Sequence, residues 1–154
     1  MVEEASESVE TERTMRAVVL RAGTRILAVD ALEVLEIALR GRVTRVPHSP
    51  PYLHGLSLIS GRLMPVFSLR ILLGSEPGPP AQNLPRLVIL SSEAGPLAFA
   101  CDEARGVAVL ELRDDVGSGN FEAHCAVWDE GEIGVLNTRA LVEAAMAHTK
   151  ERTH

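Results

Sequence analysis

Hydrophobic residues fall into short runs along most of the chain, and glycine, proline or charged residues separate one run from the next. The runs are rich in Val, Ile and Leu and are about as long as strands. They read "AVVL", "RILAV", "YLHGLSLIS", "RLMPVFSLRILL", "RLVILSS", "PLAFACDEARGVAVLELR" and "HCAVWDEGEIGVL". Such a pattern favours an antiparallel barrel or sandwich over a parallel βαβ sheet.

Glycine-containing turns join several of these runs into predicted hairpins. Three such turns lie at residues 22–23, 60–62 and 129–131. Pro65 lies inside the second run of the middle hairpin, where a proline predicts an edge strand or a bulge. Further prolines crowd residues 47–51 and 74–85, which we expect to be an extended connector and a long loop.

Two segments have helical features. Asp30 can cap a short helical turn over residues 31–34, with Glu33 at capping-box spacing, and a strand follows from about Leu35. Near the C-terminus, Asn137 or Thr138 can cap a helix. The apolar side of this helix is predicted from the spacing of Ala140, Leu141, Ala144, Ala145 and His148.

The composition is that of a folded protein with few aromatic residues. Of the 154 residues 46% are hydrophobic and 3% aromatic, enough for one domain or for two small lobes that share a core. The net charge of −6 argues against a nucleic-acid binder. No apolar run approaches the roughly 20 residues of a membrane span. Residues 1–14 are acidic and polar, and we expect a solvated tail that is dispensable for folding.

Residues with chemical potential do not form a recognisable catalytic or metal-binding pattern. The five histidines lack HxxxH spacing, and Cys101 and Cys125 form no CxxC pair. There is also no glycine-rich phosphate loop and no GxSxG elbow. We therefore expect no catalytic residue, metal or cofactor, and favour a binding or structural module. An unrelated small β-barrel enzyme or ligand-binding protein is the remaining alternative.

The segment "EVLEIALRGRVTRVPHSPPYLHGLSLISG", followed by "RLMPVFSLRILLG", resembles the signature region of CheW-like domains, the coupling proteins of bacterial chemosensory systems. The family has a "V-x-E-I/V" element, a proline loop, an "NLRG" tetrapeptide and a "PVhDLR" run. With "LAFACDEARGV" and "GEIGVLNTRALV", the resemblance covers about residues 15–148. In the signature region the matching residues are Val34, Glu36, Ile37, Pro47, Pro50, Tyr52, Gly55, Gly61, Pro65, Val66, Leu69 and Arg70.

The resemblance implies a mainly β fold of two small SH3-like five-stranded β-barrel lobes packed together, with a C-terminal helix. It divides the chain into an acidic tail (1–14), a CheW-like domain (15–148) and a C-terminal tail (149–154). It implies a cytoplasmic, non-enzymatic adaptor associated with receptor arrays at the inner membrane, without inserting into the membrane itself.

The implied partners are the signalling tip of a methyl-accepting chemoreceptor, docked between the lobes, and the regulatory domain of a CheA-type histidine kinase. No nucleic acid is expected. The kinase-binding residues are not assigned by the resemblance. The positions aligned with receptor-binding ones are Val34, Glu36, Gly55, Ser60 and Gly61.

Three departures from the family pattern concern polar residues, and one of them is Asn137 in place of the aspartate of the closing "LLD". Ser60 replaces the arginine of "NLRG", and Ser68 replaces the aspartate of "DLR". Serine lacks the charge and reach of arginine, so we expect Glu36 to be unpaired unless Arg62, Arg42 or a partner supplies a cation. A divergent adaptor that has lost or changed one partner, kinase or receptor, is therefore the alternative within the family.

Overall fold

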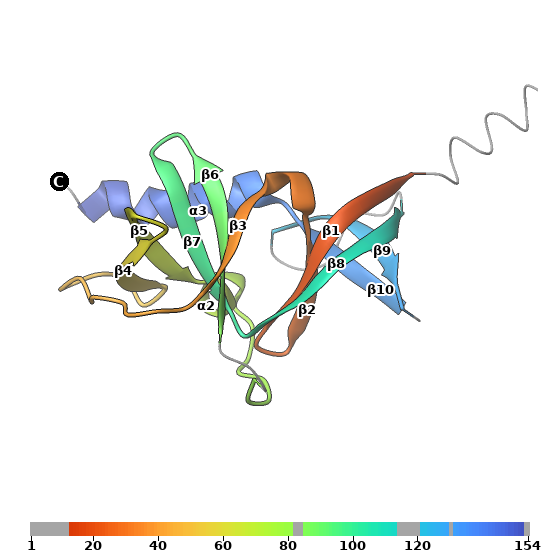
Figure 1. Cartoon of the computed structure of the whole chain (residues 1–154), viewed down its shortest axis with the longest axis horizontal. Helices are drawn as coiled ribbons and strands as arrows, with labels where there is room; N and C mark the ends of the chain where they lie inside the picture. Colours follow the sequence, from red (N-terminus) through yellow and green to blue (C-terminus); the bar gives the residue numbers. More distant parts are fainter. Residues whose placement is uncertain (1–12, 82–84, 114–120, 130, 153–154) are drawn as a thin grey trace, which may run out of the picture.

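The computed structural model describes residues 13–81, 85–113, 121–129 and 131–152. Within these ranges the elements are mostly strands, and Figure 1 shows them gathered into two lobes along the long axis of the molecule. In chain order the elements are β1 (Thr14–Ala22), β2 (Arg25–Asp30), the 3-10 helix η1 (Ala31–Glu33), β3 (Val34–Leu39), β4 (Leu53–Ile59), β5 (Arg62–Ser68), α2 (Leu69–Leu73), β6 (Arg86–Ser92), β7 (Gly95–Cys101), β8 (Glu103–Leu112), β9 (Glu122–Trp128), β10 (Gly131–Leu136) and α3 (Thr138–Arg152).

The first lobe is a closed barrel in which neighbouring strands follow the order β1-β2-β10-β9-β8. The pairs β1–β2 and β9–β10 are antiparallel, which confirms two of the predicted hairpins. A short parallel pairing of β10 with β2 joins these hairpins, and β8 closes the barrel against β1. This lobe therefore combines strands from both ends of the chain.

The second lobe is a five-stranded sheet with the order β3-β6-β7-β5-β4, and it is built from one continuous part of the chain. Its two outer strands approach each other through the segment that follows β3. There Thr44 and Leu56 each donate an amide hydrogen to the other's carbonyl, both at 2.8 Å. The predicted architecture of two five-stranded lobes with a C-terminal helix is confirmed.

Three groups of buried side chains hold the fold together. One fills the barrel of the first lobe, around Val19 and Ile133, and another lies within the second lobe, around Val66 and Ile89. The third lies between the lobes and includes residues of both, such as Leu20, Phe67 and Phe99, together with Leu141 and Ala145 of α3. The two lobes thus share a core and form one unit.

Several local predictions are confirmed by backbone and side-chain hydrogen bonds. Asp30 caps η1, because its carboxylate accepts the amide hydrogen of Leu32 at 2.9 Å. Asn137 caps α3 through a 3.1 Å hydrogen bond from the Ala140 amide. Helix α3 continues to Arg152, past residue 148, while residues 1–12 of the predicted tail lie outside the described ranges.

Of two predictions about the run "RLMPVFSLRILL", one is wrong and the other is met in one of its alternatives. Its last part is helix α2 rather than strand, because Ser68 caps the helix by accepting from the Ile71 amide, and Gly74 ends it in a left-handed conformation. Strand β5 is not an edge strand, because it lies between β4 and β7, but its pairing with β4 shifts register opposite Val66 and Phe67, so the predicted alternative of a bulge is met next to Pro65. Pro65 is tolerated since the pairing of β5 with β7 begins only at Val66.

Candidate protein-binding surface

Glu36 and Ser60 meet at one exposed corner of the second lobe. Glu36 lies on β3, and Ser60 begins the turn between β4 and β5. The Ser60 hydroxyl donates a hydrogen bond of 2.6 Å to Glu36 Oε1, so the expectation that Glu36 would be unpaired is wrong. The turn is close enough to β3 that the short serine side chain reaches the carboxylate. The pair nevertheless keeps a net negative charge, which an arginine at this position would cancel.

The turn at this corner depends on left-handed backbone conformations. Ser60 has φ of 49° and Gly61 has φ of 81°, the combination that a two-residue turn of type I′ requires. A Cβ atom at Gly61 would meet nothing within 4 Å. The backbone conformation at position 61 therefore favours glycine over other residues, and Gly61 lies exposed beside Ser60.

Gly55 and Val34 lie apart from this exposed corner. Gly55 is buried in β4 with φ of 146°, and a Cβ atom there would lie 2.1 Å from the carbonyl oxygen of Thr44. The glycine therefore permits the close approach of the segment after β3 that nearly closes the second lobe. Val34 is half-buried and packs against the core between the lobes. Of the five predicted site residues, the structure brings together Glu36, Ser60 and Gly61.

Sequence reasoning missed a set of exposed apolar side chains near this corner and on the first lobe. Leu58 and Leu63 face each other across the β4–β5 hairpin and are 70% and 67% exposed. The unbroken apolar run of the hairpin was a signal for β-structure but did not indicate which side faces solvent. The other large exposed apolar residues are Leu32, Leu35, Ile37 and Leu39 on η1 and β3, and Val107 and Val109 on β8.

Arg21, on β1, has a buried side chain and connects the two lobes through three hydrogen bonds. Its guanidinium donates to the carbonyl of Gly23 at 2.8 Å, to the carbonyl of Pro79 at 3.0 Å and to Glu103 Oε2 at 3.0 Å. Pro79 belongs to the loop between α2 and β6, so the contact joins the second lobe to the β1–β2 turn. The hydrogen bond from Arg21 holds the pKa of Glu103 below its usual value. Arg21 therefore helps to fix how the lobes sit relative to each other.

The described residues with potential chemistry do not converge. No group of three His, Cys, Asp or Glu side chains among them is placed to hold a metal ion. Burial raises the pKa of the Cys101 thiol to about 12, so this thiol stays protonated and is a poor nucleophile. Burial, and then the charges of Arg40, Arg45 and Arg70, lower the pKa of His54. No helix in the described ranges is long and apolar enough to cross a membrane.

A cavity of about 740 Å³ lies between α3 and the β6–β7 hairpin. Its rim carries Glu33, Glu93 and Glu143, and its walls include Leu90 and Val142. None of the five predicted site residues lines it. The predicted site residues that are exposed, Glu36, Ser60 and Gly61, therefore lie at the corner of the second lobe and not in this cavity.

Comparison with known proteins assigns the family. A family model described as the CheW-like domain matches residues 16–145. No curated protein sequence matches the chain. The fold is similar to that of the scaffolding protein TtCheW from Thermoanaerobacter tengcongensis, with a TM-score of 0.68, 19% identity, and coverage of 79% of this chain and 88% of that one. Since the family model spans most of the chain, the protein belongs to the CheW-like domain family, whose members are non-enzymatic scaffolds and adaptors of chemotaxis signalling.

Proposed function

We propose that the protein is a cytoplasmic adaptor that couples a methyl-accepting chemoreceptor to a CheA-type histidine kinase and has no enzymatic activity of its own. The observation that carries this proposal is the set of exposed apolar side chains on strands of both lobes. Soluble monomeric proteins rarely leave apolar residues grouped on their surface unless another protein covers them. Val107 and Val109 lie on the first lobe, and Leu58 and Leu63 on the second, so each lobe offers a surface to a partner.

The receptor-binding corner in this proposal consists of Glu36, Ser60 and Gly61. Glu36 and Ser60 present a negatively charged pair in a defined pose, held by the 2.6 Å hydrogen bond between them. Charged groups fixed in one pose contribute mainly to the choice of partner. Val34 and Gly55 lie apart from the corner and have structural roles in this proposal, because Val34 anchors β3 to the core and Gly55 admits the segment after β3.

A changed partner is the second candidate, and the Ser60–Glu36 pair favours it. With serine at this position the corner stays negative, whereas the arginine of the family pattern would neutralise it. A receptor or kinase that meets the family's arginine would meet here a group of different charge and length. Replacing the serine, as in Ser60→Arg, should then improve binding to an ordinary chemotaxis receptor or kinase that the wild type binds poorly.

The test is to measure co-sedimentation of the protein with receptor-containing membranes and, separately, its affinity for the CheA-type kinase. Glu36→Lys should weaken receptor binding by about tenfold or more, equivalent to about 1.4 kcal/mol, without changing the thermal unfolding midpoint. Glu93→Lys is the matched control, since Glu93 is also exposed but lies on the β6–β7 turn. Receptor affinity that is equal in the two variants would refute the assignment of the corner.

A further inference from the structure

The second lobe contains a long stretch of sequence with positive charge and no negative charge. From residue 37 to residue 75 there is no Asp or Glu, although the whole chain has 21 of them and a net charge of −6. The same stretch holds five of the 15 Lys and Arg residues: Arg40, Arg42, Arg45, Arg62 and Arg70. The charge of the molecule is therefore divided unevenly along the chain.

The fold places three of these arginines along one edge of the second lobe. Arg40, Arg42 and Arg45, here called the arginine strip, belong to the segment that follows β3 and are all exposed. The pairing of Thr44 with Leu56 lays this segment beside β4. Val43 packs into the core of the second lobe, so Arg42 beside it points outward, while Arg40 and Arg45 reach solvent nearer the ends of the segment. The strip is thus part of the closing edge of the lobe.

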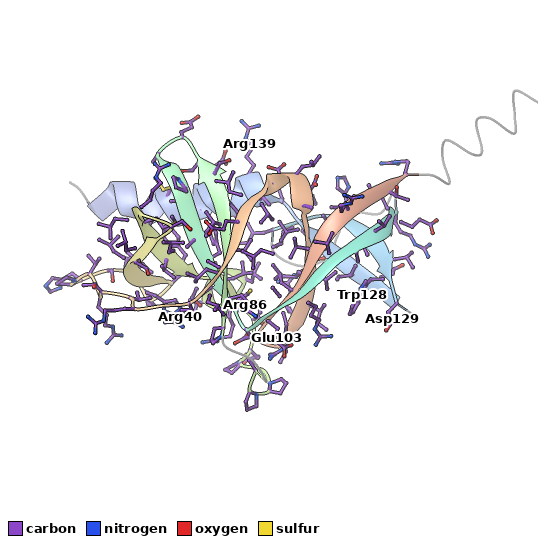
Figure 2. The ribbon with its side chains drawn as sticks, viewed as in Figure 1. Arg40, Arg86, Glu103, Trp128, Asp129 and Arg139 are labelled. Atoms are coloured by element: carbon purple, nitrogen blue, oxygen red, sulfur yellow. The ribbon has the colours of Figure 1, made fainter. Side chains whose placement is uncertain are left out.

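A fourth arginine adds to the charge at one end of the strip. Arg86 lies opposite Leu39 in the β3–β6 pairing, and the Arg40 amide donates to the carbonyl of Pro85 at 3.0 Å. Figure 2 shows Arg40 and Arg86 on the same lower side of the second lobe. Positive charge therefore continues from the strip to the start of β6.

The strip has no counter-charge among the residues that the structure describes. Four arginines elsewhere do: Arg21 and Arg105 pair with Glu103, Arg25 pairs with Glu122, and Arg139 pairs with Glu143. No such ion pair is formed by Arg40, Arg42 or Arg45 within the described ranges. The lowered pKa of His54, caused first by burial and then by Arg40 and Arg45 among others, is consistent with an uncompensated positive field.

We propose that the arginine strip binds a carboxylate-rich segment of a partner protein. A guanidinium presents its donors in a planar fork that matches a carboxylate, and three in one extended segment can engage several Asp or Glu side chains. Leu39 and Leu58, 53% and 70% exposed, lie beside the strip and add an apolar contact. Apolar residues bordered by charge are typical of protein interfaces.

A protein fits this surface better than an extended polyanion does. The carboxylates of the chain lie outside the stretch that contains the strip, so a nucleic acid or an anionic membrane would meet repulsion beyond it. An acidic segment of limited size touches the strip alone. The arginine strip would thus set the chemistry of one partner of the proposed adaptor. It depends on the proposed function only insofar as the chain binds other proteins.

The experiment selects peptides from a random library displayed on phage against the wild-type protein. The same selection is made against the variant Arg40→Gln/Arg42→Gln/Arg45→Gln. We expect the wild type to enrich peptides that combine Asp or Glu with Leu, Ile or Phe, and the variant to lose them. The best peptide is then synthesised, and its affinity should fall about tenfold or more in the variant and also fall as salt is added.

A matched variant separates the strip from net charge. Arg16→Gln/Arg105→Gln/Arg139→Gln removes three exposed arginines from β1, β8 and α3, and should bind the peptide like the wild type. Equal weakening in both variants, or a selection without acidic enrichment, would overturn the proposal. Polyphosphate or phosphatidylserine vesicles that bind at least as tightly, with the same dependence on the strip, would also overturn it in favour of a general anion site.

The peptide measurement contains neither receptor nor kinase, so its outcome is separate from that of the proposed function. Receptor co-sedimentation of wild type and Glu36→Lys is measured in parallel on the same preparations. Peptide binding without receptor or kinase binding would leave the strip established and the adaptor function refuted. If the protein binds receptor and kinase but selects no acidic peptides, the adaptor function would be supported and the arginine strip would be refuted as a binding site.

Discussion

Arginine side chains have different surroundings at the junction of the lobes and on the outer edge of the second lobe. At the junction, Arg21 is buried, with 6% of its side chain exposed, and donates to Glu103 and to carbonyls of two loops. On the outer edge, Arg40, Arg42 and Arg45 are exposed and form no ion pair with a described residue. Arginine therefore stabilises the fold at the junction of the lobes, whereas on the outer edge of the second lobe it remains free to bind a partner. Substitutions should separate these roles, since one affects stability and the other affects binding.

The largest expected effect is that of Arg21→Met. The variant removes a buried cation, leaves the carbonyls of Gly23 and Pro79 without this donor and leaves Glu103 with Arg105 alone, which should lower the free energy of unfolding by about 3 kcal/mol. Urea unfolding measures this loss. Arg42→Met is the control from the arginine strip and should change the free energy of unfolding by less than about 0.5 kcal/mol. Similar losses of unfolding free energy in the two variants would contradict the idea that Arg21 stabilises the fold and that the arginine strip does not.

A smaller effect is expected at the edge that carries the strip. Gly55→Ala places a methyl group against the Thr44 carbonyl, 2.1 Å from the ideal Cβ position, at a positive φ. We expect a loss of about 2–3 kcal/mol in the free energy of unfolding, because the segment after β3 must move and the backbone is strained. Gly61→Ala shares the positive φ but has open space around it, so its loss should be about 1 kcal/mol.

Gly55→Ala also tests whether peptide binding by the arginine strip depends on the pairing that closes the second lobe. If the pairing of Thr44 with Leu56 holds the arginines in place, Gly55→Ala should weaken the acidic peptide selected on the wild type, whereas Gly61→Ala should not. Peptide affinity and urea unfolding are measured on both variants. Unchanged stability and peptide affinity in Gly55→Ala would show that the close approach at Thr44 is unimportant.

The smallest effect is the dependence of stability on pH, and the two regions should respond in different ranges. The pKa of His54 is lowered from 6.5, so the unfolded chain takes up a proton first and stability falls as the pH drops below 6.5. The pKa of Glu103 is lowered from 4.5 by Arg21, so its contribution is lost only as the pH falls below 4.5. Urea unfolding across both ranges should show the first loss reduced in His54→Gln and the second reduced in Glu103→Gln. A loss between pH 6.5 and 4.5 that is unaffected by His54→Gln would contradict this account.

The sequence was sufficient to predict those features that depend on neighbouring residues. Alternation of apolar runs and turns predicted the hairpins, and the caps at Asp30 and Asn137 follow from side chains that bond to amides a few residues ahead. The short helix α2 was missed, because its apolar residues also suit a strand and only the Ser68 cap and Gly74 separate the two outcomes.

Features that depend on distant contacts were less accessible. The hydrogen bond between Ser60 and Glu36 spans 24 residues, and the burial of Gly55 results from the return of the chain at Thr44. Family resemblance placed both glycines and Glu36 in one signature region, but could not separate the exposed residues from the buried one. Likewise, the exposure of Leu58 and Leu63 is set by which face of the hairpin meets the core, and both faces of this run are apolar.

The order of strands in the two lobes also has a consequence for how the protein is made. The second lobe uses only elements between η1 and β7, so all of its strands are available once residue 101 has left the ribosome. The first lobe cannot close until β10 has been synthesised, because β2 needs β10 and β1 needs β8. During this interval Phe67 and Phe99, which belong to the core between the lobes, lack their partners from β10 and α3. We therefore expect the nascent chain to be most prone to chaperone binding and aggregation after the second lobe has formed and before the C-terminal strands appear.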